Sequence, residues 1–170
     1  MTATEAEPFK AAMSALATAV TVVASRESGS PVAMVMGTLT MVSEDPPLVA
    51  VLPKRSSSTW RRVAATGRFT ASVLAADQRE IVAGLAGRSD ARFSRIDWDE
   101  TEAGGAAVAG CVSALDAEIQ AEHVAGDHLI VVARVVGLRV DEVPSAPLLF
   151  FRRAFHRTIP VPDLPTSRWH

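Results

Sequence analysis

Short apolar runs, each bounded by glycine, proline or polar residues, dominate the hydrophobic pattern of the chain. Residues 20–24 and 128–140 are dense in β-branched side chains, and residues 68–75 alternate between apolar and polar positions. These patterns are typical of β-strands rather than helices. The predicted strands are 20–24, 32–40, 48–52, 68–75, 111–122, 128–140 and 147–151.

Three segments carry a helical pattern instead. In residues 8–20, Pro8 suits a first helical turn, and apolar side chains recur on one face. Ser57 or Ser58 can cap a second helix that runs to about residue 65. A third helix is predicted at 78–86, whereas the glycine-containing, polar segment 87–110 is predicted to be irregular.

The order of these elements predicts the fold class. Strands do not alternate regularly with helices, which argues against a doubly wound parallel sheet. A mainly β fold with peripheral helices, built on a closed or partly split antiparallel barrel, fits better because closure removes exposed strand edges. With 170 residues, one domain over 1–170 is expected, with an extended tail from about 159 to 170.

Composition narrows the class of protein. The net charge is −2 and no basic run occurs, which argues against a nucleic-acid partner. Cys111 is the only cysteine, so no intrachain disulfide can form and a reducing cytoplasm fits. No apolar run approaches the roughly 20 residues of a membrane helix, so we expect no membrane partner.

Hydroxyl side chains cluster where the second helix begins. Arg55, Ser56, Ser57, Ser58 and Thr59 follow a predicted buried strand. Hydroxyls and backbone N–H groups at a helix start favour an anion such as a phosphate. Helix capping is the alternative interpretation, and one serine satisfies it. The four histidines show no metal-ligand spacing, and no familiar catalytic motif is present, so no metal site is expected.

The chain resembles the flavin reductase family. The resemblance covers Phe9 to about His156 and rests on several short motifs in family order. These motifs are Phe9–Val23, Ser43-Glu44-Asp45-Pro46-Pro47-Leu48, Gly67-Arg68-Phe69 with Val73-Leu74-Ala75, Asp77-Gln78, Asp90-Ala91-Arg92-Phe93, Gly126-Asp127-His128 and Pro147–Arg152.

The resemblance implies a homodimeric FMN-binding split β-barrel that binds FMN or FAD. It also implies an enzyme that passes hydride from NADH or NADPH to the flavin and supplies reduced flavin to a partner monooxygenase. Such chemistry needs little acid–base help from the protein, because the cofactor carries it. The rival class is a non-catalytic or differently specialised split-barrel protein that binds flavin or haem, since fold alone does not fix function.

The resemblance also implies site residues. It assigns the phosphate to Arg55, Ser56, Ser57, Ser58 and Thr59. It assigns the flavin ring to Val35, Met36, Gly37 and Thr38, where the family has a segment resembling Thr-x-Asn-Ser-Phe. The first hydroxyl and the amide of that segment are missing here. An ordinary buried strand is the alternative for this segment.

Five further positions follow from the resemblance, and four of them have a structural alternative. Ser72 lies near the flavin or packs in the core. Arg88 and Phe93 border the cofactor, or are a solvated arginine and a core phenylalanine. His128 lies beside the nicotinamide, where a neutral imidazole can hydrogen-bond the carboxamide, or it caps a turn. Phe155, in an aromatic segment near the C-terminal end, lies beside the nicotinamide together with His128.

Overall fold

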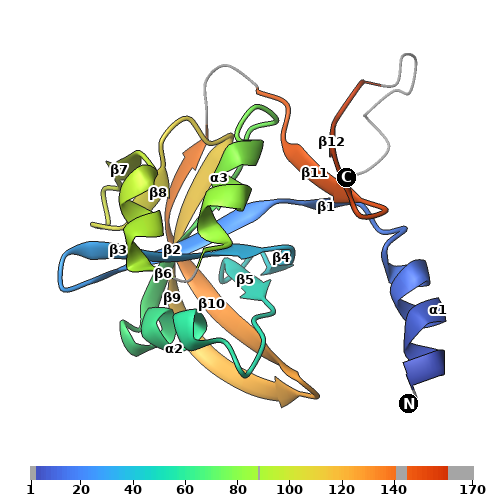
Figure 1. Cartoon of the computed structure of the whole chain (residues 1–170). Helices are drawn as coiled ribbons and strands as arrows, with labels where there is room; N and C mark the ends of the chain where they lie inside the picture. Colours follow the sequence, from blue (N-terminus) through green and yellow to red (C-terminus); the bar gives the residue numbers. More distant parts are fainter. Residues whose placement is uncertain (1–2, 88, 141–144, 161–170) are drawn as a thin grey trace.

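The computed structural model describes residues 3–87, 89–140 and 145–160. One antiparallel sheet of seven strands forms its body (Figure 1). In sheet order these strands are β3 (Ser30–Met36), β2 (Thr21–Glu27), β6 (Arg68–Val73), β9 (Ser113–Ala125), β10 (His128–Val140), β5 (Leu48–Val51) and β4 (Leu39–Ser43).

The seven-stranded sheet curls round on itself. Its two outermost strands, β3 and β4, are consecutive in the chain, and only Gly37 and Thr38 separate them. A link of two residues cannot span an open sheet of this width, so the two edges come together. The result is a split β-barrel with helices at its periphery, and the predicted fold class is confirmed.

Three helical segments pack on or near the barrel: α2 (Ser58–Ala65), α3 (Arg79–Leu85) and a 3₁₀ helix, η1 (Asp90–Arg95). The prediction for α2 is confirmed, since Ser57 Oγ accepts a hydrogen bond from Trp60 N at 3.0 Å and caps the helix. Gly67 then turns the chain into β6 with a φ of 74°. Gln78 is the N-cap residue of α3, and its side chain makes no capping hydrogen bond.

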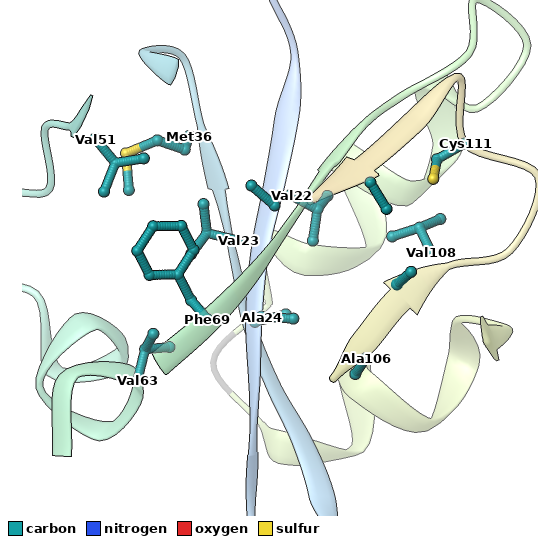
Figure 2. Packing of buried hydrophobic residues seen from close by; sticks show 14 of the residues in the cluster. Val22, Val23, Ala24, Met36, Val51, Val63, Phe69, Ala106, Val108 and Cys111 are labelled. Atoms are coloured by element: carbon teal, nitrogen blue, oxygen red, sulfur yellow. The ribbon is translucent and has the colours of Figure 1, made fainter. Parts of the chain in front are cut away.

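Two apolar layers lie on opposite sides of the central strands (Figure 2). Val23, Phe69 and Val63 fill the layer beneath α2, whereas Val22 and Val108 belong to the other layer. Adjacent residues of β2 therefore enter different layers, as the period of a strand requires. Cys111 is 3% exposed and lies in the second layer as a small buried side chain.

The second layer is covered by a hairpin that the sequence did not indicate. Residues 87–110, predicted to be irregular, contain η1 and the strands β7 (Trp98–Glu100) and β8 (Ala106–Val108). Trp98 Nε1 donates to the Phe93 carbonyl at 2.8 Å and fixes the start of this hairpin. Its strands have only three residues each, too few for a periodic signal.

An arm projects from the barrel (Figure 1). It consists of α1 (Ala3–Met13) and a small sheet of β1 (Thr18–Ala19), β11 (Leu148–Phe151) and β12 (Ala154–Arg157). Arg152 N donates to the Ser14 carbonyl at 2.8 Å, which ties the end of α1 to the β11–β12 turn.

The prediction for the first helix is wrong in two respects. The helix spans Ala3–Met13 rather than 8–20, with Pro8 inside it. Its apolar side chains do not enter the core of this chain: Phe9 and Met13 are 58% and 47% exposed, and Leu16, which lies beyond its end, is 57% exposed. Of the predicted tail, residues 161–170 lie outside the described part of the chain. None of the described helices has the length and apolar character of a membrane span.

Candidate functional site

Three segments that are distant in the sequence meet at one end of the barrel. The loop 53–57 lies against the β9–β10 turn, because Arg55 N donates to the Asp127 carbonyl at 3.0 Å and Lys54 forms an isolated β-bridge with His128. The β3–β4 link lies alongside, since Leu39 pairs with Val51 and Ser57 Oγ lies 3.9 Å from Met34 Sδ. The predicted ring segment, phosphate loop and His128 are therefore neighbours.

The hydroxyl-rich loop has donors left over after capping. Ser57 is occupied as the helix cap, but Ser56 and Ser58 are exposed. Ser58 and Thr59 open α2, and the first N–H groups of a helix have no intrahelical acceptor. The helix dipole adds positive potential at this end. Capping and anion binding are therefore compatible, because different residues of the loop serve each.

Arg55 lies at the barrel side of this loop. Its Nη1 donates to the Gly126 carbonyl at 3.1 Å, and the side chain is exposed. A guanidinium carries five N–H donors, so one carbonyl leaves most of them free. The contact holds the charge beside the loop without neutralising it.

His128 is oriented by its neighbour. Its Nδ1 lies 2.9 Å from Asp127 Oδ1, and a carboxylate can only accept, so Nδ1 is the donor and Nε2 remains free for another partner. The hydrogen bond from His128, followed by the charge of His128, holds the pKa of the Asp127 carboxyl below its ordinary value. The His128 side chain is 37% exposed, which leaves it reachable from solvent.

These residues fit a flavin. At Gly37, a Cβ atom would meet nothing closer than Thr18 Oγ1 at 4.0 Å, so the backbone of the β3–β4 link borders open space. A flat ring can approach such a backbone closely, and its N–H and carbonyl groups can replace the missing hydroxyl and amide. The hydroxyl-rich loop follows β5, the strand that pairs with β4 just beyond this link.

Of the remaining predicted residues, Ser72 and Phe155 lie away from this end of the barrel, and Phe93 is buried under the Arg92 side chain. Ser72 is 1% exposed and its Oγ accepts from Val108 N at 3.0 Å, in the apolar layer away from α2. Phe93 is 4% exposed and belongs to the hydrophobic core. Phe155 lies in the arm, against Phe150 at 5.4 Å between ring centroids. Arg88 lies outside the described residues.

Arg92 is a residue that sequence reasoning missed. It belongs to η1, and its Nη2 donates to Thr59 Oγ1 at 3.4 Å. The two residues are 33 positions apart, so no local pattern relates them. The only sequence signal is the family block Asp90-Ala91-Arg92-Phe93, which contains it.

An ion-pair network sets the distance between α2 and η1. Arg62 of α2 lies 2.6 Å from Glu27 Oε2 and 3.0 Å from Asp90 Oδ2. Hydrogen bonds from Arg62 lower the pKa of both carboxyls, and the two carboxylates, Glu27 foremost, raise the pKa of Arg62. Because Asp90 opens η1, the network also fixes Arg92 relative to Thr59.

A hollow of about 240 Å³ lies elsewhere, between the central strands and the 103–105 loop. Its lining includes Arg68, Thr70 and Asp116 but none of the predicted site residues. We place the candidate site at the convergence of the loop, the β3–β4 link and His128 instead. A cofactor needs several polar groups of suitable chemistry aimed at one place, and this end of the barrel supplies them.

The family described as "Flavin reductase like domain" matches residues 13–158. The reductase subunit HsaB of a flavin-dependent monooxygenase from Mycobacterium tuberculosis is 30% identical over 145 residues, which are 85% of this chain and 78% of that protein.

Two solved structures are similar to the whole chain. Nitrilotriacetate monooxygenase component B from Mycobacterium thermoresistibile matches with a TM-score of 0.92 and 28% identity, over 99% of this chain and 94% of that one. The NADH:FAD oxidoreductase SgcE6 from Streptomyces globisporus, solved with NAD and FAD fragments, matches with a TM-score of 0.86 and 28% identity, over 96% and 98%.

Proposed function

The chain belongs to the flavin reductase-like family, and from this premise we propose that it is an NAD(P)H-dependent flavin reductase. It reduces FMN or FAD and supplies the reduced flavin to a partner monooxygenase. The observation that carries the proposal is the convergence of the 55–59 loop, the open backbone at Gly37 and the oriented His128 at one end of the barrel. The reaction needs reduced nicotinamide, which fits a cytoplasmic location.

The roles of the residues follow from their chemistry. Arg55, Ser56, Ser58 and Thr59 hold the flavin phosphate, together with the free N–H groups that open α2. The backbone of Val35, Met36, Gly37 and Thr38 borders the ring. His128 donates or accepts through Nε2 at the nicotinamide carboxamide, held in place by Asp127. The flavin, when bound, supplies the acceptor for the hydride.

The protein acts as a homodimer in this proposal. The exposed apolar side chains of α1 pack against a second copy of the chain. Phe150 and Phe155 of the β11–β12 hairpin belong to the same contact. Phe155 lies in the arm, which extends away from the β9–β10 turn that carries His128 (Figure 1). We therefore assign Phe155 to the site of the partner subunit rather than to that of its own chain.

A second candidate function is a binder that holds flavin or haem without turnover. The departure at residues 35–39 favours it, because the first hydroxyl and the amide of the segment that the resemblance implies are missing here. Turnover separates the two candidates.

The purified protein is expected to oxidise NADH or NADPH only when FMN, FAD or riboflavin is added. Loss of absorbance at 340 nm measures this directly. Oxidation that is absent with all three flavins, in a protein that still binds one of them, would leave the binder as the function.

Replacing His128 by alanine is expected to raise the KM for the nicotinamide or lower kcat, with flavin affinity almost unchanged. A neutral hydrogen bond predicts a loss of about 0.5–1.5 kcal/mol in kcat/KM. His128→Asn should restore part of it, since an amide keeps a donor and an acceptor. If flavin affinity and melting temperature fall instead, while nicotinamide kinetics stay the same, His128 only holds the turn.

A further inference from the structure

Asp116 is a buried carboxylate that the proposed reaction does not use. It is 7% exposed, and its Oδ1 accepts a hydrogen bond from Thr70 Oγ1 at 2.6 Å. For Oδ2, the described part of the chain supplies no hydrogen bond, and Asp116 belongs to none of the ion pairs there. A carboxylate buried without a cation costs stability, and a positively charged ligand would offset that cost.

Asp116 lines the hollow of about 240 Å³ between the central strands and the 103–105 loop, as does Arg68. This volume is below the roughly 300–1,000 Å³ of typical ligand pockets, so the hollow suits a small molecule rather than a flavin or a dinucleotide. The hollow also touches Thr66, just beyond the C-terminal end of α2, whereas the phosphate loop lies at the other end of this helix. The 8 residues of α2 separate the two ends by about 12 Å.

Arg68 and Asp116 lie on the same face of the sheet. In the antiparallel pair of β6 and β9, Thr70 is opposite Asp116 and Arg68 is opposite Glu118. Arg68 and Asp116 are therefore diagonal neighbours, and such residues lie about 7–8 Å apart. Their side chains form no ion pair in the described structure, so a gap separates the two charges.

The 103–105 loop lies against both charged groups. Arg68 Nη1 donates to the Ala103 carbonyl at 3.3 Å. Gly105 lies directly over the carboxylate, because a Cβ atom there would overlap with Asp116 Oδ1. Ala103 and Gly105 are two residues apart, and two residues of chain span at most about 7 Å. The guanidinium and the carboxylate therefore lie at the two ends of a gap that one small molecule can bridge.

The other charged residues of the hollow leave these two groups available. Glu118 lies 3.7 Å from Arg134 and is paired with it. Arg26 also lines the hollow, and its Nη1 donates to a backbone carbonyl of the β2–β3 turn at 3.2 Å. Neither Arg26 nor Arg68 is paired with a carboxylate among the described residues. A ligand that carries a single charge would satisfy only one side of this arrangement.

We propose that this hollow binds a small zwitterion with adjacent ammonium and carboxylate groups, as in an α-amino acid. The ammonium group donates to the carboxylate of Asp116, and the ligand's carboxylate accepts from Arg68, with Arg26 beside it. Val136, which also lines the hollow, favours a small apolar side chain on the ligand. The inference does not depend on the proposed function, because none of these residues belongs to the candidate flavin site.

The test is isothermal titration calorimetry of the full chain with L-valine and with two molecules that each keep one of its charges. Isobutylamine lacks the carboxylate, and isovalerate lacks the ammonium group. L-valine should bind about tenfold more tightly than either, or better, because it makes one more charge-assisted contact. Saturating FMN should leave the affinity for L-valine unchanged, since the phosphate loop lies at the other end of α2.

Two substitutions assign the charges. Asp116→Asn keeps an acceptor for Thr70 and should weaken L-valine and isobutylamine by about tenfold, but not isovalerate. Arg68→Gln should weaken L-valine and isovalerate by about tenfold, but not isobutylamine. Because Arg68 is exposed, this variant tests the site even if Asp116→Asn fails to fold. The matched control, Arg79→Gln, removes an exposed arginine of α3 that pairs with its neighbour Glu80, and it should change none of the affinities.

Three results would overturn the inference. The first is the absence of binding of L-valine up to millimolar concentration. The second is equal affinity for L-valine and for one of the singly charged molecules, with no effect of one of the two substitutions, because the hollow then takes only a cation or only an anion. The third is displacement of L-valine by FMN, which would make the hollow part of the flavin site.

Discussion

Gly105→Ala is expected to lower the free energy of unfolding by about 3 kcal/mol, the upper range for overpacking. A Cβ atom at this position would lie 2.0 Å from Thr70 Oγ1, 2.3 Å from Asp116 Oδ1 and 2.8 Å from Thr101 Oγ1. Real Cβ atoms do not come this close to other heavy atoms, so the loop or the side chains must move.

No small movement of the neighbouring side chains removes the clash at Gly105. Thr70 and Asp116 are short, buried side chains, 1% and 7% exposed, and Thr70 Oγ1 donates to Asp116 Oδ1. Gly105 N itself donates to Thr101 Oγ1 at 2.8 Å. Moving any of the three oxygens strains or breaks a hydrogen bond, and for the buried Thr70 and Asp116 side chains this adds the cost of an unpaired buried group.

Thermal unfolding measures the effect. For a chain of this size, a loss of 3 kcal/mol corresponds to a melting temperature lower by roughly 6–12 °C. Gly84→Ala is the matched control, because Gly84 lies in α3 with nothing within 4 Å of the added methyl group. It should stabilise the protein by about 0.5–1 kcal/mol, as alanine does in a helix interior. An unchanged melting temperature for Gly105→Ala would show that the 103–105 loop does not cover Asp116 closely.

Gly105 also illustrates why part of the fold could not be predicted. The segment 87–110 has too many glycines and polar residues to show a period, so it was predicted to be irregular. Its short β7–β8 hairpin exists because it covers the apolar layer next to β6, where Val108 N donates to Ser72 Oγ. Such an element depends on tertiary packing, which a local pattern does not record.

Elements with local signals were predicted well. Ser57 lies directly before the first residue of α2, and Gly67 lies two residues after its last, so both local signals mark the ends of the helix closely. The valine-rich strand 128–140 was predicted with the bounds that β10 has. The first helix shows the limit of this reasoning. Periodicity indicated an apolar face, but it cannot tell whether that face enters the chain's own core or another surface.

The residues of the candidate site also differ in whether a local sequence signal predicts them. Arg55, the serines and His128 carry local signals, namely a helix start and a tight turn, and they are neighbours in the structure. Ser72 was assigned from its position in the family alone, and strand alternation turns its hydroxyl into the apolar layer next to Val108. Arg92 reaches Thr59 only because Arg62 joins α2 to Asp90 of η1. That contact arises from the fold rather than from the sequence near either residue.

The largest expected effect on activity comes from mixing two defective proteins. In the proposed homodimer, each site combines the loop of one subunit with the arm of the other. Arg55→Ala removes the phosphate contact on the barrel, and Phe155→Ala removes the aromatic ring on the arm. Each variant alone should lose about tenfold in turnover at limiting FMN, roughly the value of one such contact.

Co-expression of the two variants in equal amounts should restore activity. A mixed dimer has one site with both defects and one site with neither, because the intact loop and the intact arm come from different chains. Random assembly makes about half of the dimers mixed, so about a quarter of all sites are intact under two-fold symmetry. The mixture should therefore turn over at about a quarter of the wild-type rate or slightly more, against about a tenth for either variant alone.

A second mixture serves as the control. Arg55→Ala with His128→Ala places both defects on the barrel, where the loop and the β9–β10 turn of the same chain meet. No mixed dimer then has an intact site, and the activity should stay at the mean of the two variants. Recovery in the first mixture but not in the second requires that Phe155 acts across the subunit interface. The absence of recovery in both, in a protein shown by light scattering to be a dimer, would mean that the arm only joins the subunits and takes no part in the site.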